Sequence, residues 1–236
     1  MTICLTTTGE PRALALAGLD GSDGGPVVHL GAGGVSADVV WREGTAQGSA
    51  GRPKVIAQAG PGLWRCAPWP VRDELFELAP PAERKVLVVG DEPDRSQVSE
   101  WLDDDRLLEA DVLDRGDLEE AAVVAFAQPD ARSLPAPAFA VLAAGRVLVV
   151  RNPSVSFGLL PGIDHLAAGT AAGAGELAAA AMLHWDAFAA VREFGRLAAQ
   201  PHRASTVYSR LAHDLDRADQ YPARAGEQGS STVTTP

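Results

Sequence analysis

The 236-residue sequence has only two cysteines, Cys4 and Cys66, and this excludes a framework of disulfides. It also lacks a run of basic residues, and its formal charge is −11, so a polyanion such as nucleic acid would be repelled. No apolar stretch approaches the roughly 20 residues needed to cross a bilayer, and the N-terminus lacks the basic and apolar regions of a leader. These absences predict a soluble, cytoplasmic protein with no membrane span and no nucleic-acid partner.

Aromatic residues make up only 6% of the chain, so alanine, leucine and valine must fill the core of a sequence that is 46% hydrophobic. Such residues suit parallel strands that are covered by alanine-rich helices. The histidines do not follow a metal-ligand spacing such as His-Glu-x-x-His, and no Gly-x-Ser-x-Gly nucleophile turn is present. We therefore expect no metal site and no bound cofactor, and we assign no catalytic residue.

Three segments of the chain differ in composition: residues 1–52, 53–219 and 220–236. The first is rich in glycine, and its short apolar runs Val27–Leu30 and Val39–Trp41 predict strands of a small sheet or reduced lobe. The last is rich in glycine, serine, threonine and charged residues, which indicates a disordered tail. Residues 53–219 are thus expected to form the main domain.

Strand and helix patterns alternate in the main domain. Continuous apolar runs at Lys85–Gly90, Ala121–Ala127 and Arg146–Val150 predict strands that are buried on both faces. The stretch Glu176–Gln200 is strongly helical, with a break at Trp185-Asp186. This alternation predicts an α/β fold with a Rossmann-like parallel sheet and helices on both faces.

The same domain is expected to contain one further strand and four further helices. The strand is Val55–Ala57, which precedes a turn at Gly60-Pro61-Gly62. The helices are Val71–Leu78, Ser96–Leu102, Ala138–Ala144 and Thr206–Asp216, the last with Ser205 as its cap.

The order of several short motifs is more informative than the composition. In chain order they are Ala144-Gly145 before a strand, Pro161-Gly162-Ile163-Asp164-His165, Glu176-Leu177, Gly195-Arg196, and Tyr208 with Arg210. This order is similar to that of the C-terminal lobe of two-lobed GT-B glycosyltransferases of the group 1 type. It looks most similar to the group that resembles spore-maturation-protein glycosyltransferases, which has many actinobacterial members.

The resemblance covers about residues 60–217 and implies a metal-independent glycosyltransferase that binds a nucleotide diphosphate sugar and transfers a hexosyl group. Donor binding is expected at the carboxyl ends of the strands, where open α/β sheets bind ligands. The residues implied for it are Gly90, Asp91, Gly158, Pro161, Gly162, Asp164 and His165. We expect the two glycine turns to converge at one rim, where helix-start amides would hold the diphosphate.

Two features depart from the family. The helix before Gly145 lacks the acidic residue and the arginine that often face the donor. The N-terminal segment is also shorter than the roughly 100–150 residues of a typical domain, so an acceptor site would have to come from a homo-oligomer or a partner subunit. The alternative hypothesis is a catalytically degenerate relative that acts as a binding or assembly module.

Other patterns have simpler interpretations. Gly31-Ala32-Gly33 begins a dinucleotide fingerprint, but Ser36 stands at the third glycine position and Ala37–Trp41 predicts a strand, so a tight turn is favoured over NAD or FAD binding. Asp164 can cap a β-turn locally instead of binding a sugar. Four arginines can place cations near a phosphate, although pairing with acidic side chains is favoured: Arg192, Arg196, Arg203 and Arg210.

Overall fold

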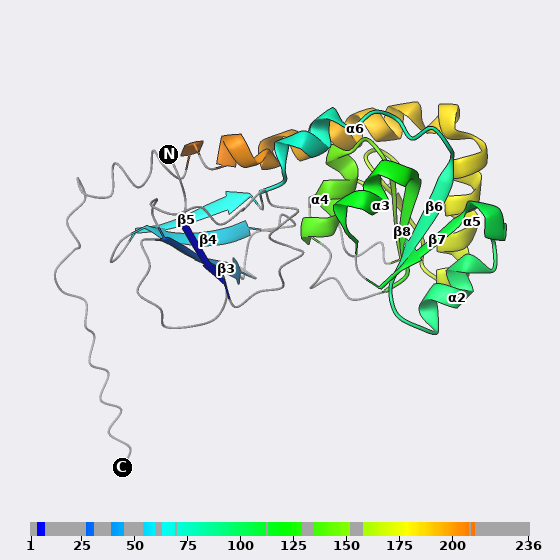
Figure 1. Ribbon diagram of the computed structural model, residues 1–236, viewed down its shortest axis with the longest axis horizontal. Helices are drawn as coiled ribbons and strands as arrows, with labels where there is room; N and C mark the ends of the chain where they lie inside the picture. The colour runs from blue at the N-terminus through cyan, green and yellow to red at the C-terminus, as the bar shows by residue number, and fades with distance from the viewer. Residues whose placement is uncertain are drawn as a thin grey trace, which may run out of the picture.

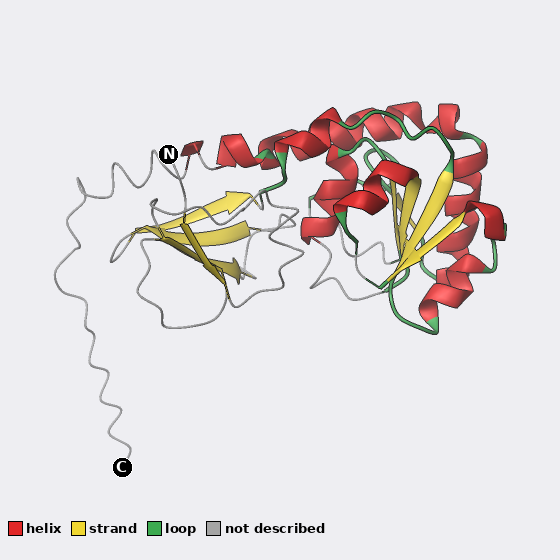
Figure 2. Cartoon of the chain, viewed as in Figure 1, coloured by secondary structure: helices red, strands yellow, loops and turns green. Residues whose placement is uncertain are grey.

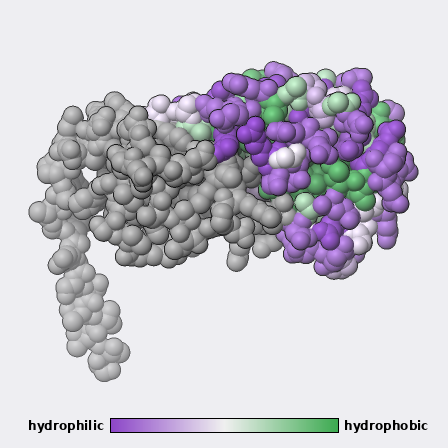
Figure 3. Space-filling view, in the orientation of Figure 1, coloured by the Kyte–Doolittle hydropathy of each residue, from purple (hydrophilic) through white to green (hydrophobic). Residues whose placement is uncertain are grey.

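The computed structural model describes residues 4–7, 27–30, 39–44, 54–59, 63–68, 70–111, 113–128, 135–151, 158–207 and 209–210. These residues form two five-stranded sheets, and Figure 1 shows the helices gathered around the second of them. The visible surface of this helical region is largely polar, with apolar patches between the polar residues (Figure 3). Within the described ranges, no helix combines the length and apolar character needed to cross a membrane.

The first sheet has the strand order β1-β2-β3-β4-β5. Strands β1 to β3 are parallel, and β4 and β5 add to β3 as antiparallel neighbours. Their bounds are Cys4–Thr7, Val27–Leu30, Val39–Gly44, Lys54–Ala59 and Leu63–Pro68. The strands predicted at Val27–Leu30 and Val39–Trp41 are confirmed, while Gly31-Ala32-Gly33 lies outside the described residues.

The strand predicted at Val55–Ala57 is also confirmed, but it belongs to this first sheet as part of β4. The chain therefore changes sheets between Pro68 and Lys85, whereas composition divides it between residues 52 and 53. Composition does not reveal that the change of sheet comes after β5, because β4 joins β3 through backbone pairing, from Val39 opposite Ala59 to Gly44 opposite Lys54.

The second sheet has the strand order β10-β9-β8-β6-β7, and all its neighbouring strands are parallel. Its strands, in chain order from β6, are Lys85–Val89, Leu107–Ala110, Ala121–Phe126, Val147–Val150 and Leu166–Ala167. The central strands β6, β8 and β9 are the three that the apolar runs predict. This sheet confirms the predicted α/β fold, in which a parallel Rossmann-like sheet is covered on both faces.

Helices pack on both faces of this sheet (Figure 2). Alternate residues of β6 supply the two cores: Val86 and Val88 face α2 and α5, while Leu87 and Val89 face the side of α3 and α4. Helix α6 packs against α4. The helix bounds are Asp94–Ser99 for α2, Arg115–Glu120 for α3, Pro135–Ala143 for α4, Ala171–Leu183 for α5 and Ala189–Ala199 for α6.

Short 3-10 turns connect these elements: η1 Asp73–Glu77, η2 Asp104–Arg106, η4 Trp185–Phe188 and η5 Gln200–His202. The predicted break at Trp185-Asp186 is confirmed by η4, which separates α5 from α6. The helix expected at Val71–Leu78 is the shorter η1, because Val71 instead forms backbone hydrogen bonds with His202 and Ala204.

The other predicted helices occur with shifted ends, since α2 begins at Asp94 and α4 at Pro135. The final helix is described only for residues 204–207 and 209–210. Ser205 lies inside it and is not its cap, so this detail of the prediction is wrong. The amide of Ser205 instead donates to Oδ1 of Asp73 at 3.2 Å, a long-range contact that local sequence does not reveal.

Candidate functional site

The connections between strands reverse at the centre of the parallel sheet. After β6 the chain crosses through α2 on one face to β7, and after β8 it crosses through α4 on the other face to β9. Neighbouring strands β6 and β8 therefore send their following helices to opposite faces. In open α/β sheets, ligands bind beside the carboxyl ends of strands at such a reversal.

Gly90 occupies the carboxyl end of β6 at this reversal. Its φ of +148° is rarely available to other residues, and a Cβ at this position would lie 3.2 Å from Cβ of Ala127 and 3.3 Å from Cγ of Gln128. Its amide donates to the carbonyl of Ala110 at 3.1 Å. The structure thus places Gly90 where the chain turns closely past the end of β8, as the strand-end glycine predicts.

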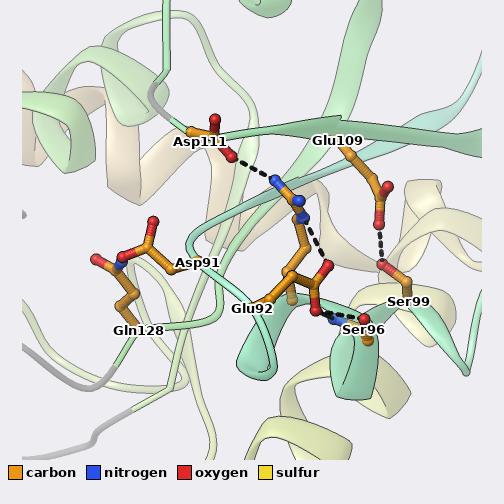
Figure 4. A network of polar contacts seen from close by, with 8 residues as sticks. Asp91, Glu92, Ser96, Ser99, Glu109, Asp111 and Gln128 are labelled. Carbon is orange, nitrogen blue, oxygen red and sulfur yellow. Dashed lines mark hydrogen bonds and ion pairs between the residues drawn. The ribbon is translucent and has the colours of Figure 1, made fainter.

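Polar side chains surround this turn (Figure 4). The amide Nε2 of Gln128, which follows β8, donates to the carboxylate of Asp91 across the two strand ends. The carboxylate of Glu92 accepts hydrogen bonds from the hydroxyl and the amide of Ser96, and these lower the pKa of Glu92, as does Arg95. Asp91 and Glu92 are thus held in fixed positions at the edge.

Two arginines cross-link the same edge. Nη1 of Arg95 lies 2.6 Å from Oδ1 of Asp111, and this hydrogen bond is the main cause of a raised pKa for Arg95. Nη1 of Arg151, which follows β9, lies 2.5 Å from Oδ1 of Asp94 and also donates to the carbonyl of Ala127 at 3.2 Å.

The described charges of this edge are five carboxylates and two guanidinium groups: Asp91, Glu92, Asp94, Glu109, Asp111, Arg95 and Arg151. The edge is therefore acidic overall, which favours ligands that present hydroxyl groups. Helix α5 begins beside it, because Ala168 follows β10 and donates to the carbonyl of Val150. Oγ1 of its cap, Thr170, accepts from the amide of Gly173 at 3.0 Å.

The turn formed by Pro161–His165 lies elsewhere. Strand β10 is parallel to β9, with Leu166 opposite Val149, so the residues before Leu166 lie toward the amino ends of the strands. The carbonyl oxygen of Asp164 is 2.9 Å from the position of a Cβ on Gly195 of α6. The expected convergence of the two glycine turns at one rim is therefore wrong, because the chain returns toward the amino side after β9 before it enters β10.

The side chain of Asp164 is occupied by its own turn. Both of its carboxylate oxygens lie 2.9 Å from the amide of Leu160, and Oδ1 lies 2.8 Å from Nδ1 of His165. Both side chains are buried, and the amide of Gly162 donates to the carbonyl of His165 at 2.7 Å. Gly158 and Gly162 have φ values of +79° and +80°, which the turn requires. These contacts match the local β-turn interpretation of Asp164.

The arginines near the C-terminal helices contact carbonyl groups and rings. Arg192 donates to the carbonyl of Trp185 at 2.5 Å and lies 3.7 Å above its ring. Arg196 donates to the carbonyl of Phe76, and Arg203 lies 4.4 Å above the Phe76 ring. Among the described residues no ion pair joins these three arginines to an acidic side chain, although the charge of Asp186 acts on Arg192; Asp214 lies outside the described residues, and the predicted pairing of Arg210 stays untested.

Gln128, Arg95 and Arg151 belong to the edge but are absent from the sequence-based set. Each lies at or soon after the end of a strand, so the rule that selects Gly90 and Asp91 applies to them as well once the strands are known. Among the described residues, no group of three or more histidine, cysteine or acidic side chains is arranged to hold a metal ion.

Comparison with protein-family models gives no match for this chain, and comparison with curated proteins also gives none. Functional inference therefore depends on the order of the motifs, the fold and the geometry of the β6–β8 edge.

Proposed function

We propose that this chain is a glycosyltransferase-like protein that binds a nucleotide diphosphate sugar at the carboxyl ends of β6 and β8. The main support is the reversal of connections between these two strands, together with the close turn at Gly90. The order of motifs along the chain independently favours a sugar-nucleotide ligand.

The chemistry of the edge suits the hydroxyl-rich part of such a ligand. Carboxylates accept hydrogen bonds from ribose and sugar hydroxyl groups, and Asp91 and Glu92 are fixed beside the glycine turn. Gly90 has no side chain, so a ligand can approach the backbone. The start of α5 offers amide groups and a positive dipole end to the diphosphate. Binding of this kind requires no metal ion.

A second candidate is a degenerate relative that acts as a binding or assembly module. It is favoured by the turn at Pro161–His165, where Asp164 is satisfied by Leu160 and His165 and which lies toward the amino ends of the strands. The acidic character of the edge also opposes tight diphosphate binding. In this case the acceptor-side residues, if any, would come from a homo-oligomer or a partner subunit.

Thermal unfolding in the presence of UDP, GDP, dTDP and NAD separates the two candidates. One nucleoside diphosphate is expected to stabilise the full chain by about 2.7 kcal/mol at ~100 times its Kd. The variant Asp91→Ala should lose this stabilisation, and the control Asp105→Ala, on an exposed turn, should keep it. Stabilisation that Asp91→Ala retains would refute binding at this edge, and no response to any nucleotide would favour the assembly module.

Turnover requires a separate measurement. If a nucleoside diphosphate stabilises the chain, the corresponding nucleotide sugar is incubated with it and release of the diphosphate is followed over time. Release that Asp91→Ala abolishes supports a transferase or hydrolase, whereas binding without release supports a degenerate relative.

A further inference from the structure

Three arginines gather at the amino side of the parallel sheet, opposite the β6–β8 edge. Arg146 directly precedes β9, and Arg192 and Arg196 lie one turn apart on α6. Gly145, in the turn before Arg146, has a φ of +66°, and a Cβ there would lie 3.0 Å from Cδ of Arg196. Arg196 therefore lies directly over the turn that carries Arg146.

Arg146 is 2% exposed, and its guanidinium group is only partly satisfied. Nε donates to the carbonyl of Leu118 and Nη2 to that of Ala79, each at 2.9 Å. Nη1 donates to none of the described residues, and it is not one of the fully buried atoms that lack a partner. Burial, together with the charges of Arg196 and Arg192, lowers the pKa of Arg146 to about 10.

Within the part of the chain that the structure describes, the other two guanidinium groups also keep unused donors. Arg192 and Arg196 are each partly exposed and use a single N–H group on a carbonyl. Among the described residues, none of the three arginines has a carboxylate within ion-pair distance. Burial is the main influence on the pKa of Arg192 and lowers it, whereas the charge of Asp186, which pairs with Arg84 at 3.6 Å, raises it.

We propose that Arg146, Arg192 and Arg196 form a binding site for a phosphate group, either free or carried by a small phosphate ester. Among the described residues the three cations have no carboxylate within ion-pair distance, so their mutual repulsion in a partly buried position is only partly offset, and a bound dianion would reduce it. Arginine supplies forked N–H donors that match phosphate oxygens. In a chain with a net charge of −11, such a cluster is a local exception to the repulsion of anions.

This site is separate from the proposed nucleotide site. Arg146 precedes its strand, whereas Gly90 and Asp91 follow theirs, so the two sites lie at opposite ends of parallel strands. The phosphate site consequently does not depend on the proposed function, and a variant at one edge should leave the other unaffected.

The test is thermal unfolding of the full chain in increasing inorganic phosphate, with sodium chloride adjusted to keep ionic strength constant. We expect a saturable rise in Tm of about 2–4 °C at roughly five times the Kd. Arg192→Gln and Arg196→Gln should each lose at least half of this rise relative to their own phosphate-free baseline. The control Arg115→Gln, whose arginine pairs with Glu119 on exposed α3, should retain it, as should Asp91→Ala.

Labelling of the wild-type chain with phenylglyoxal covers the case in which a variant does not fold. Phosphate should slow modification of Arg192 and Arg196 but not that of Arg115, as measured by peptide mass spectrometry. The proposal is overturned if phosphate gives no saturable rise in Tm, or if it protects Arg115 from modification as well as it protects Arg192 and Arg196. It is also overturned if Asp91→Ala abolishes the rise while the α6 variants keep it, since phosphate would then bind at the β6–β8 edge.

Discussion

Replacement of Gly175 by alanine tests the contact that sets the position of α2, the helix that follows the Gly90 turn. A Cβ on Gly175 would lie 2.5 Å from the carbonyl oxygen of Val98 and 2.7 Å from Cδ1 of Trp101. Ordinary contact begins at 3.4 Å, so α2 and α5 must separate by about 0.9 Å. Because the nearest atom belongs to the backbone, rotation of a side chain does not relieve the clash.

The expected magnitude follows from two opposing effects. Alanine favours a helix over glycine by about 1 kcal/mol, and overpacking of a close contact costs about 1–3 kcal/mol. A backbone clash places Gly175→Ala at the upper end of that cost, so we expect a net destabilisation of about 2 kcal/mol. The free energy of unfolding is measured by urea denaturation followed by circular dichroism.

Gly116 in α3 provides a matched control, because the nearest atom to a Cβ there is Oδ1 of the Asp114 side chain at 3.3 Å and not a backbone atom. Gly116→Ala should be neutral or stabilising by up to about 1 kcal/mol. The packing explanation is refuted if Gly175→Ala unfolds at the same urea concentration as Gly116→Ala or at a higher one.

Two further changes address the turn itself. Gly90→Ala should destabilise the chain by about 1–3 kcal/mol in urea, because φ is +148° and Ala127 lies close; unchanged stability would contradict the strain argument. Ser96→Ala should raise the pKa of Glu92 toward its ordinary value of 4.5, as followed by NMR titration. Since the Glu92 pKa is lowered in the folded chain, the contacts of Glu92 stabilise the fold above pH 4.5, and this stabilisation is lost as the pH falls. A Glu92 pKa that does not move in Ser96→Ala would rule out Ser96 as the main cause.

The sequence alone determined the centre of the parallel sheet. Strands β6, β8 and β9 have both faces buried, so their residues form continuous apolar runs that can be recognised without coordinates. The same pattern identified Gly90 as the turn at the end of β6. The break before α6 followed from local composition at Trp185-Asp186 as well.

Only the tertiary structure decided which residues meet. Strand β7 is partly exposed at a sheet edge and β10 has two residues, so neither produces a recognisable pattern. Asp91 and Gln128 are 37 residues apart and touch because β6 and β8 are neighbours, while Gly145 and Arg196 meet because α6 packs against α4. Hydrophobic periodicity reports the burial of each segment, whereas the choice of neighbours depends on packing summed over the whole domain.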